Sequence, residues 1–112
     1  MAKTVTIADG ASLSGAASIP EGHTLTAVLI PATWTAAGVT FQGAVDQGAT
    51  YKNVFNTAGE VAFATDAAGR FLVCKPEDFH AVRFVKVRSG TAAAAVNQVG
   101  ADRVVELVFT RH

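Results

Sequence analysis

The stretch Phe41–Phe55, FQGAVDQGATYKNVF, places a short polar loop between two runs that carry Phe, Val and Tyr. Alternation of apolar and polar residues predicts β-strands on both sides of the loop. A short loop that contains glycine, here Asp46–Thr50, is a common connection between adjacent antiparallel strands. The stretch therefore predicts a β-hairpin, in which Tyr51 and Phe55 pack across from the apolar residues of the first strand, Phe41 and Val45.

The carboxylate of Asp46, at the start of this loop, has two interpretations. It suits a calcium ion or a sugar hydroxyl, because both bind oxygen ligands. Asp is also common at the start of turns, where its side chain accepts hydrogen bonds from the backbone N–H groups that follow. The sequence contains no D-x-D-x-D-G run of a calcium loop, so the hairpin interpretation is favoured. Asp46 stays a candidate carbohydrate or partner contact.

Short alternating segments bounded by turn signals continue on both sides of this hairpin. The residues Gly90–Asp102 are Ala-rich but lack an apolar helical stripe, so they are expected to connect two strands. Residues 1–112 thus predict one all-β domain, an antiparallel two-sheet β-sandwich, jelly-roll-like, with eight to nine short strands. The expected strands are Thr4–Ile7, Ala11–Ile19, His23–Ile30, Val39–Val45, Thr50–Asn56, Glu60–Thr65, Arg70–Lys75, Ala81–Ser89 and Arg103–Arg111.

The composition is poor in charge and balanced in sign. Charged residues make up 16% of the 112 residues, against about 25% in an average soluble protein, and the formal net charge is zero. So little charge indicates a subunit whose surface is largely covered in an assembly, and a compact monomer with an Ala-rich and Thr-rich surface is the alternative. Without a basic block, nucleic acid is not an expected partner. Without a run of 18 apolar residues, a membrane is not expected either.

The residues that usually carry catalysis do not form a recognisable set. The three histidines, His23, His80 and His112, lie in no nucleophile motif, and no spacing of His and Cys fits a metal site. Most Asp and Glu residues fall in expected turns, where they bond the backbone. We therefore expect no enzyme, no catalytic residue, no metal and no cofactor. An enzyme whose site is shared between subunits remains as an alternative. Cys74, within RFLVCK, is expected to be an inert core thiol.

The aromatic residues leave a second binding hypothesis open. Sugar-binding sandwiches stack the apolar face of a sugar on an exposed ring, and Trp34 and Tyr51 are the single Trp and the single Tyr of the chain. With Asp46 they are the candidate carbohydrate or partner contacts. The favoured alternative for Trp34 is that it closes one end of the sandwich core.

Two long segments carry a resemblance to a known group of proteins. They contain the patterns I-x-x-G-x-S-L-S, I-P-x-x-W-T-A-A-x-V-T-F-Q-x-x-x-D and R-F-x-K-V-R-S-G. The chain resembles small structural proteins encoded in the virion gene clusters of tailed bacteriophages. The segments are TVTIADGASLSGAASIPEGHTLTAVLIPATWTAAGVTFQGAVDQGATYKNVFNTAGE, residues 4–60, and FHAVRFVKVRSGTAAAAVNQVGADRVVELV, residues 79–108.

The resemblance implies a β-sandwich that decorates or cements a capsid, or one that serves in a head fibre or tail. The implied partners are the major capsid protein or other virion proteins, and the implied state is a homo-oligomer, for which we expect a trimer. The implied location is the virion, after synthesis in the host bacterial cytoplasm; the N-terminus lacks the apolar segment of a signal peptide. The hairpin and R-F-V-K-V-R are also similar to discoidin-type and carbohydrate-binding sandwiches. A carbohydrate-binding or adhesion module of a tail or head fibre is therefore the alternative.

The N-terminus is expected to take part in assembly. We expect residues 1–6 to extend from the sandwich as an arm that pairs with the sheet edge of a neighbouring subunit. The residues expected to make this inter-subunit contact are Lys3, Thr4, Val5 and Thr6.

Overall fold

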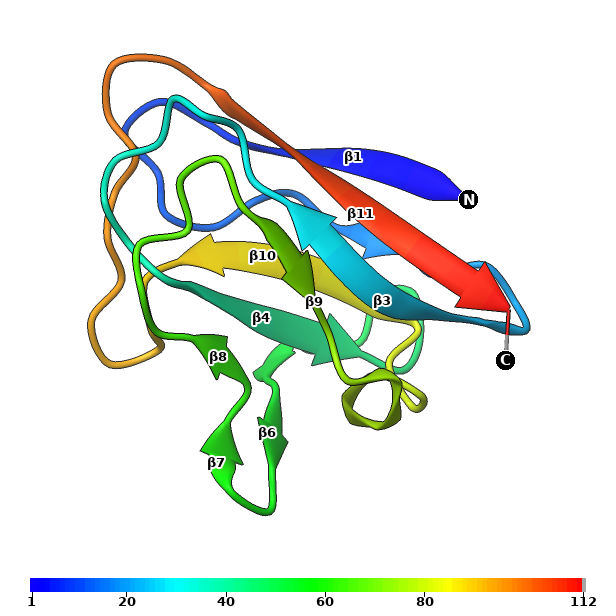
Figure 1. Ribbon diagram of the computed structural model, residues 1–112. Coiled ribbons are helices and arrows are strands. Elements are labelled where there is room, and N and C mark those ends of the chain that lie inside the picture. Colours follow the sequence, from blue (N-terminus) through cyan, green and yellow to red (C-terminus); the bar gives the residue numbers. More distant parts are fainter. Residues whose placement is uncertain (112) are drawn as a thin grey trace.

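The computed structural model describes residues 1–111 and folds them into two antiparallel sheets packed face to face (Figure 1). The first sheet has the strand order β1-β11-β3-β9, and the second has the order β2-β10-β4-β5, with β8 also paired to β4. The elements are β1 (Ala2–Ile7), β2 (Ala17–Ser18), β3 (His23–Leu29), β4 (Val39–Ala44), β5 (Lys52–Asn53), β6 (Phe55–Asn56), β7 (Gly59–Glu60), β8 (Ala62–Phe63), β9 (Phe71–Val73), the 3-10 turn η1 (Pro76–Asp78), β10 (Phe84–Ser89) and β11 (Arg103–Arg111).

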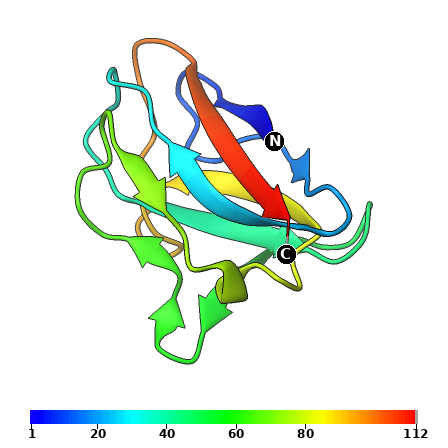
Figure 2. The same ribbon diagram turned by 45° about the vertical axis from the view of Figure 1, so that its right-hand side comes forward.

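The chain passes from one sheet to the other between successive main strands, as in a jelly roll. β1, β3, β9 and β11 belong to the first sheet, and β2, β4 and β10 to the second. The exception is the excursion after β4, where β5 and β8 pair with the same edge of β4 and the small β6–β7 hairpin projects beyond both sheets (Figures 1 and 2). The predicted all-β sandwich is therefore confirmed, with the β1–β11 pair linking the two ends of the chain.

Strict alternation along β11 builds one wall of the core. Val105, Leu107 and Phe109 are fully buried, while Val104 before them and Glu106 between them are exposed. From the facing sheet, Phe41 meets the ring of Phe79, which follows η1, edge to face at a centroid distance of 5.1 Å. Such pairs add about 0.5–1.5 kcal/mol to the burial of the two rings.

The hairpin after Phe41 forms, but with the opposite face inward from the one predicted. Val54 is buried and Phe55 is 61% exposed, so Tyr51 and Phe55 do not pack on the first strand as expected. The reason lies in the register: Asn53 pairs with Gln42, and the Val54 N–H then donates to the Phe41 carbonyl, which turns the Val54 side chain toward the core.

Several of the expected strands are shorter or divided. Thr50–Asn56 splits into β5 and β6, and Glu60–Thr65 splits into β7 and β8, which raises the number of strands to eleven. In Ala11–Ile19 only β2 is a strand, because the hydroxyl of Ser14 accepts the Val87 N–H that a continuous strand would pair with a carbonyl. Side-chain competition of this kind is typical of serine.

The N-terminal residues do not extend as an arm. β1 pairs along its whole length with β11, and its Val5 and Ile7 side chains are buried in the core. Lys3 reaches from this edge of the first sheet to β2 at the edge of the second, where its ammonium donates to the carbonyl and the hydroxyl of Ser18, both at 2.8 Å. Burial of alternate side chains explains why β1 stays in its own sheet. A contact of Lys3, Thr4, Val5 and Thr6 with another subunit stays a prediction.

Candidate docking surface

The outer face of the first sheet carries almost no charge. Residues opposite one another in an antiparallel sheet point to the same side, and the buried residues of β11 fix which side is outward. One outward row across the four strands is Ala2, Val108, Ala27 and Val73. The next row is Thr4, Glu106, Leu29 and Phe71, in which Glu106 is the single charge.

Three apolar side chains on the outer face of the first sheet are open to solvent. Val73 is 71% exposed, Phe71 63% and Val104 53%. We define the apolar face as Ala27, Leu29, Phe71, Val73, Val104 and Val108. Exposed apolar side chains grouped on one sheet face make this face the candidate docking surface. The sequence alone did not identify this face, because the strand order was needed to bring its residues together.

The outer face of the second sheet is polar, and its polar side chains bond to one another. Arg88 of β10 is buried although it points outward, and its guanidinium forms a 2.9 Å ion pair with Glu60 of β7. The same group donates to the Thr40 hydroxyl at 3.0 Å and to the Asn53 side-chain oxygen at 2.9 Å. Glu60 in turn accepts the backbone N–H of Ala92. These contacts hold β4, β5, β7 and the connection after β10 in one arrangement.

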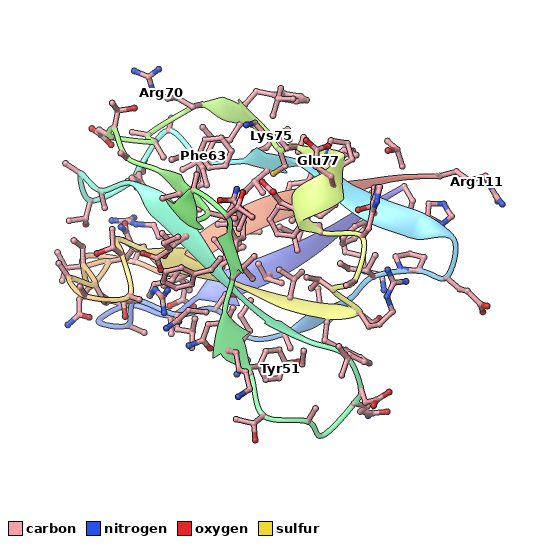
Figure 3. All side chains as sticks on the ribbon, turned by 90° about the horizontal axis from the view of Figure 1, so that it is seen from below. Tyr51, Phe63, Arg70, Lys75, Glu77 and Arg111 are labelled. Atoms are coloured by element: carbon pink, nitrogen blue, oxygen red, sulfur yellow. The ribbon has the colours of Figure 1, made fainter. Side chains whose placement is uncertain are left out.

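Tyr51 belongs to this polar face. Its ring is half-buried beneath the ammonium of Lys86, which lies 4.3 Å from the ring centroid. In Figure 3 Tyr51 lies on the opposite side of the molecule from Arg70, the residue before β9. The ring therefore faces away from the apolar face, and the Lys86 ammonium lies over it.

Trp34 closes an end of the core, as the favoured interpretation predicted. It is 8% exposed, and its indole N–H donates to the Ala37 carbonyl at 3.2 Å. A ring so placed has no open face for a sugar.

Asp46 lines a groove at the end of the second sheet. The hairpin turn is closed by the Ala49 N–H, which donates to the Asp46 backbone carbonyl at 3.1 Å. The exposed Asp46 side chain borders an open groove of about 570 Å³. Its other polar lining includes Glu21 and Arg83, next to the ring of Phe84. The structure thus separates Trp34, Tyr51 and Asp46 into a core end, a polar face and a groove, and does not bring them together.

The remaining candidate groups do not form a chemical site in the described part of the chain. His23 bonds the Glu21 carbonyl through Nδ1 at 3.0 Å, and His80 is exposed. His112 lies outside the described residues. Among residues 1–111 no cluster of three or more His, Cys, Asp or Glu side chains is placed to hold a metal ion. No helical segment of residues 1–111 has the length and hydrophobicity to span a bilayer.

The thiol of Cys74 has a shifted pKa. It is buried, as predicted, and burial, followed by the nearby charge of Asp78, raises the pKa of its thiol to about 12 from an ordinary value of 9.0. The thiolate is the reactive form, so the folded protein holds this thiol in its inert form at neutral pH.

We expect Cys74 to react with iodoacetamide at pH 8 far more slowly in the folded protein than in denaturant. The raised pKa also means that the folded state binds the thiol proton more tightly than the unfolded chain does. This contribution to stability is complete below pH ~9 and is lost as the pH rises toward ~12. Denaturant unfolding at pH 8 and at pH 10.5, for the wild type and for Cys74→Val, measures it. A wild type that loses no more stability than the variant would contradict the assignment.

Two solved structures are similar to this chain to different degrees. The crystal structure of the SPBc2 prophage-derived protein YomS matches with a TM-score of 0.54 and 13% sequence identity, over 98% of this chain and 94% of that one. A chain of the cyanophage Pam1 capsid asymmetric unit matches with a TM-score of 0.34 and 15% identity, over 96% and 83% of the two chains. The likeness to YomS, at this identity, is one of fold. No protein-family model and no curated protein sequence matches the chain.

Proposed function

We propose that this protein is a structural subunit of a bacteriophage virion, a capsid decoration or cement protein that binds across major capsid subunits. The observation that carries the proposal is the exposed apolar face of the first sheet, with Phe71, Val73 and Val104 open to solvent. The sequence resemblance to virion proteins and the shared fold with a prophage-derived protein support it. The proposal assigns no catalytic step to the chain.

The proposed mechanism is adhesion through a stiff sheet. Four strands about 4.8 Å apart, with a rise of about 3.3 Å per residue, give the outer face of the first sheet an extent of roughly 15–20 Å in each direction. The resulting footprint, on the order of 300–400 Å², is smaller than the roughly 800 Å² that each partner contributes to a standard interface. One such contact is weak, and a repeating shell that presents many sites makes it effective.

The groove beside Asp46 favours a second candidate, a carbohydrate-binding or adhesion module of a tail or head fibre. Carboxylates of Asp46 and Glu21, the guanidinium of Arg83 and the ring of Phe84 line one open groove. Sugar-binding sites combine polar groups, which bond the hydroxyls, with an aromatic ring, on which the sugar stacks. Binding on a glycan array that is lost in Asp46→Ala would support this candidate, and an array without signal would remove it.

A charge placed on the apolar face tests the main proposal. Val104→Lys should leave folding intact, because the side chain points to solvent, and should weaken binding to purified capsids of the encoding phage by about tenfold or more. Co-sedimentation of the protein with capsids that lack it measures the affinity. Thr57→Lys, at the exposed tip of the β6–β7 hairpin, is the matched control and should bind like the wild type. Equal binding of the two variants would refute docking through this face.

A further inference from the structure

The edge strand β9 presents a row of backbone groups that its own sheet does not use. β9 pairs with β3 on one side and is the last strand of the first sheet. Arg70 and Lys75 flank it, as the side chains labelled in Figure 3 show. Among residues 1–111, β3 is the one strand with which β9 pairs.

The hydrogen-bond pattern determines which groups of β9 point outward. The Ile30 N–H donates to the Arg70 carbonyl at 3.0 Å, and the Cys74 N–H donates to the Thr26 carbonyl at 2.9 Å. Bonded and non-bonded pairs alternate along an antiparallel ladder, so the N–H and C=O of Phe71 and Val73 point away from β3. Within residues 1–111, no hydrogen bond is found for these groups outside the sheet.

The side chains at the same positions are apolar and open. Phe71 is 63% exposed and Val73 is 71% exposed, whereas Leu72 between them is buried in the core. An uncovered edge with exposed apolar side chains is a template for pairing with another strand. β1, the opposite edge of this sheet, differs because Lys3 ties it to β2.

We propose that two copies of the chain pair through their β9 strands about a two-fold axis. In this register Phe71 of one copy lies opposite Val73 of the other, and Leu72 lies opposite Leu72. Each Phe71–Val73 pair exchanges two backbone hydrogen bonds, so the register uses every outward N–H and C=O of both residues. The strand is self-complementary because its aromatic and β-branched side chains then meet across the axis on the outer face.

The charges near β9 are compatible with this pairing. In the antiparallel register Arg70 of one copy lies near Lys75 of the other. Glu77 and Asp78 follow Lys75 within three residues, so the sequence around the contact carries charges of both signs.

Pairing through the edge places both apolar faces on the same side of one continuous sheet, because cross-strand neighbours share a side. The area buried by the Phe71 and Val73 side chains of both copies is on the order of 400 Å². That is well below the roughly 1,200 Å² of a stable interface, so the free dimer is weak. The inference is a two-fold pair, whereas the trimer expected from the sequence stays an untested prediction. Joining two apolar faces would strengthen capsid binding only if the proposed function holds. The pairing of the two β9 strands does not depend on the proposed function.

Sedimentation velocity of the isolated chain from ~10 µM to ~1 mM, the range in which such weak contacts form, tests the inference. The wild type should shift from the mass of one 11.5 kDa chain toward twice that mass. Val73→Pro removes an outward N–H that β3 does not use, a position where an edge strand accepts proline. It should raise the dissociation constant at least about tenfold, since half of the proposed hydrogen bonds are lost.

Two controls separate this result from other causes. Val73→Thr keeps the N–H and should dimerise within about threefold of the wild type. Val104→Lys, on the apolar face but away from β9, should dimerise normally even though capsid binding is reduced. In the wild type, amide exchange of Phe71 and Val73 should slow on concentration. A monomer at ~1 mM, a trimer, unchanged exchange at these two amides, or a dimer that survives Val73→Pro would overturn the inference.

Discussion

Replacing Gln98 by leucine should lower the free energy of unfolding by about 3–5 kcal/mol. Gln98 is fully buried in the connection between β10 and β11, and every polar atom of its side chain is bonded. Its oxygen accepts the Thr35 N–H at 2.7 Å and the Arg103 Nε–H at 3.2 Å. Its amide donates to the Thr35 carbonyl at 2.9 Å and to the Ser89 hydroxyl at 2.8 Å.

The large effect follows from the donors that leucine would leave behind. The buried Nε–H of Arg103 and the backbone N–H of Thr35 would lose their acceptor in a site that water does not reach, and each orphaned donor costs about 1–3 kcal/mol. Urea unfolding followed by circular dichroism measures the change. Gln47→Leu, the same substitution in the exposed hairpin loop, should stay within about 0.5 kcal/mol of the wild type. A Gln98→Leu protein as stable as Gln47→Leu would contradict this role.

The second large effect is expected for Arg88→Met, with a loss of about 2–4 kcal/mol. Removing one partner of a buried pair leaves the other charge uncompensated, which usually costs about 3–5 kcal/mol. The Glu60 side chain is 16% exposed, so water relieves part of that cost. The expected loss is therefore smaller than for a fully buried pair. Asn53 and Thr40 lose their donor in the same variant.

The double variant Arg88→Met with Glu60→Met distinguishes the pair from a packing effect. Because the unpaired carboxylate is then absent, the double variant should be more stable than Arg88→Met alone. Arg111→Met, at the exposed end of β11, is the matched control and should change stability by less than about 0.5 kcal/mol. Thermal and urea unfolding of the four proteins give the comparison. A double variant that is less stable than Arg88→Met would rule out the charge explanation.

The strands with strict alternation were predictable from the sequence. β11 and β3 have the predicted limits within a residue. In each case a period of two and a clear turn signal specify the segment.

The faces of short strands and the function of polar residues were not predictable. Whether Val54 or Phe55 faces the core depends on the register with β4, which a two-residue strand does not specify. Gln98 lies in an Ala-rich connection with no periodic pattern. Its contribution to stability depends on hydrogen bonds with Thr35, which is far from it in the sequence. The apolar face combines residues from β3, β9 and β11, so no single segment of sequence contains its signal.

Site-specific photo-crosslinking in the capsid-bound state tests the central proposal, that the outer face of the first sheet docks on other virion proteins. A benzophenone amino acid is placed at Val104 on the apolar face or at Gln42 on the outer face of the second sheet, and the protein is bound to capsids and irradiated. Docking as proposed predicts a crosslink to the major capsid protein from position 104 and little or none from position 42. Crosslinks from position 42 alone, or no association of the wild type with capsids, would contradict it.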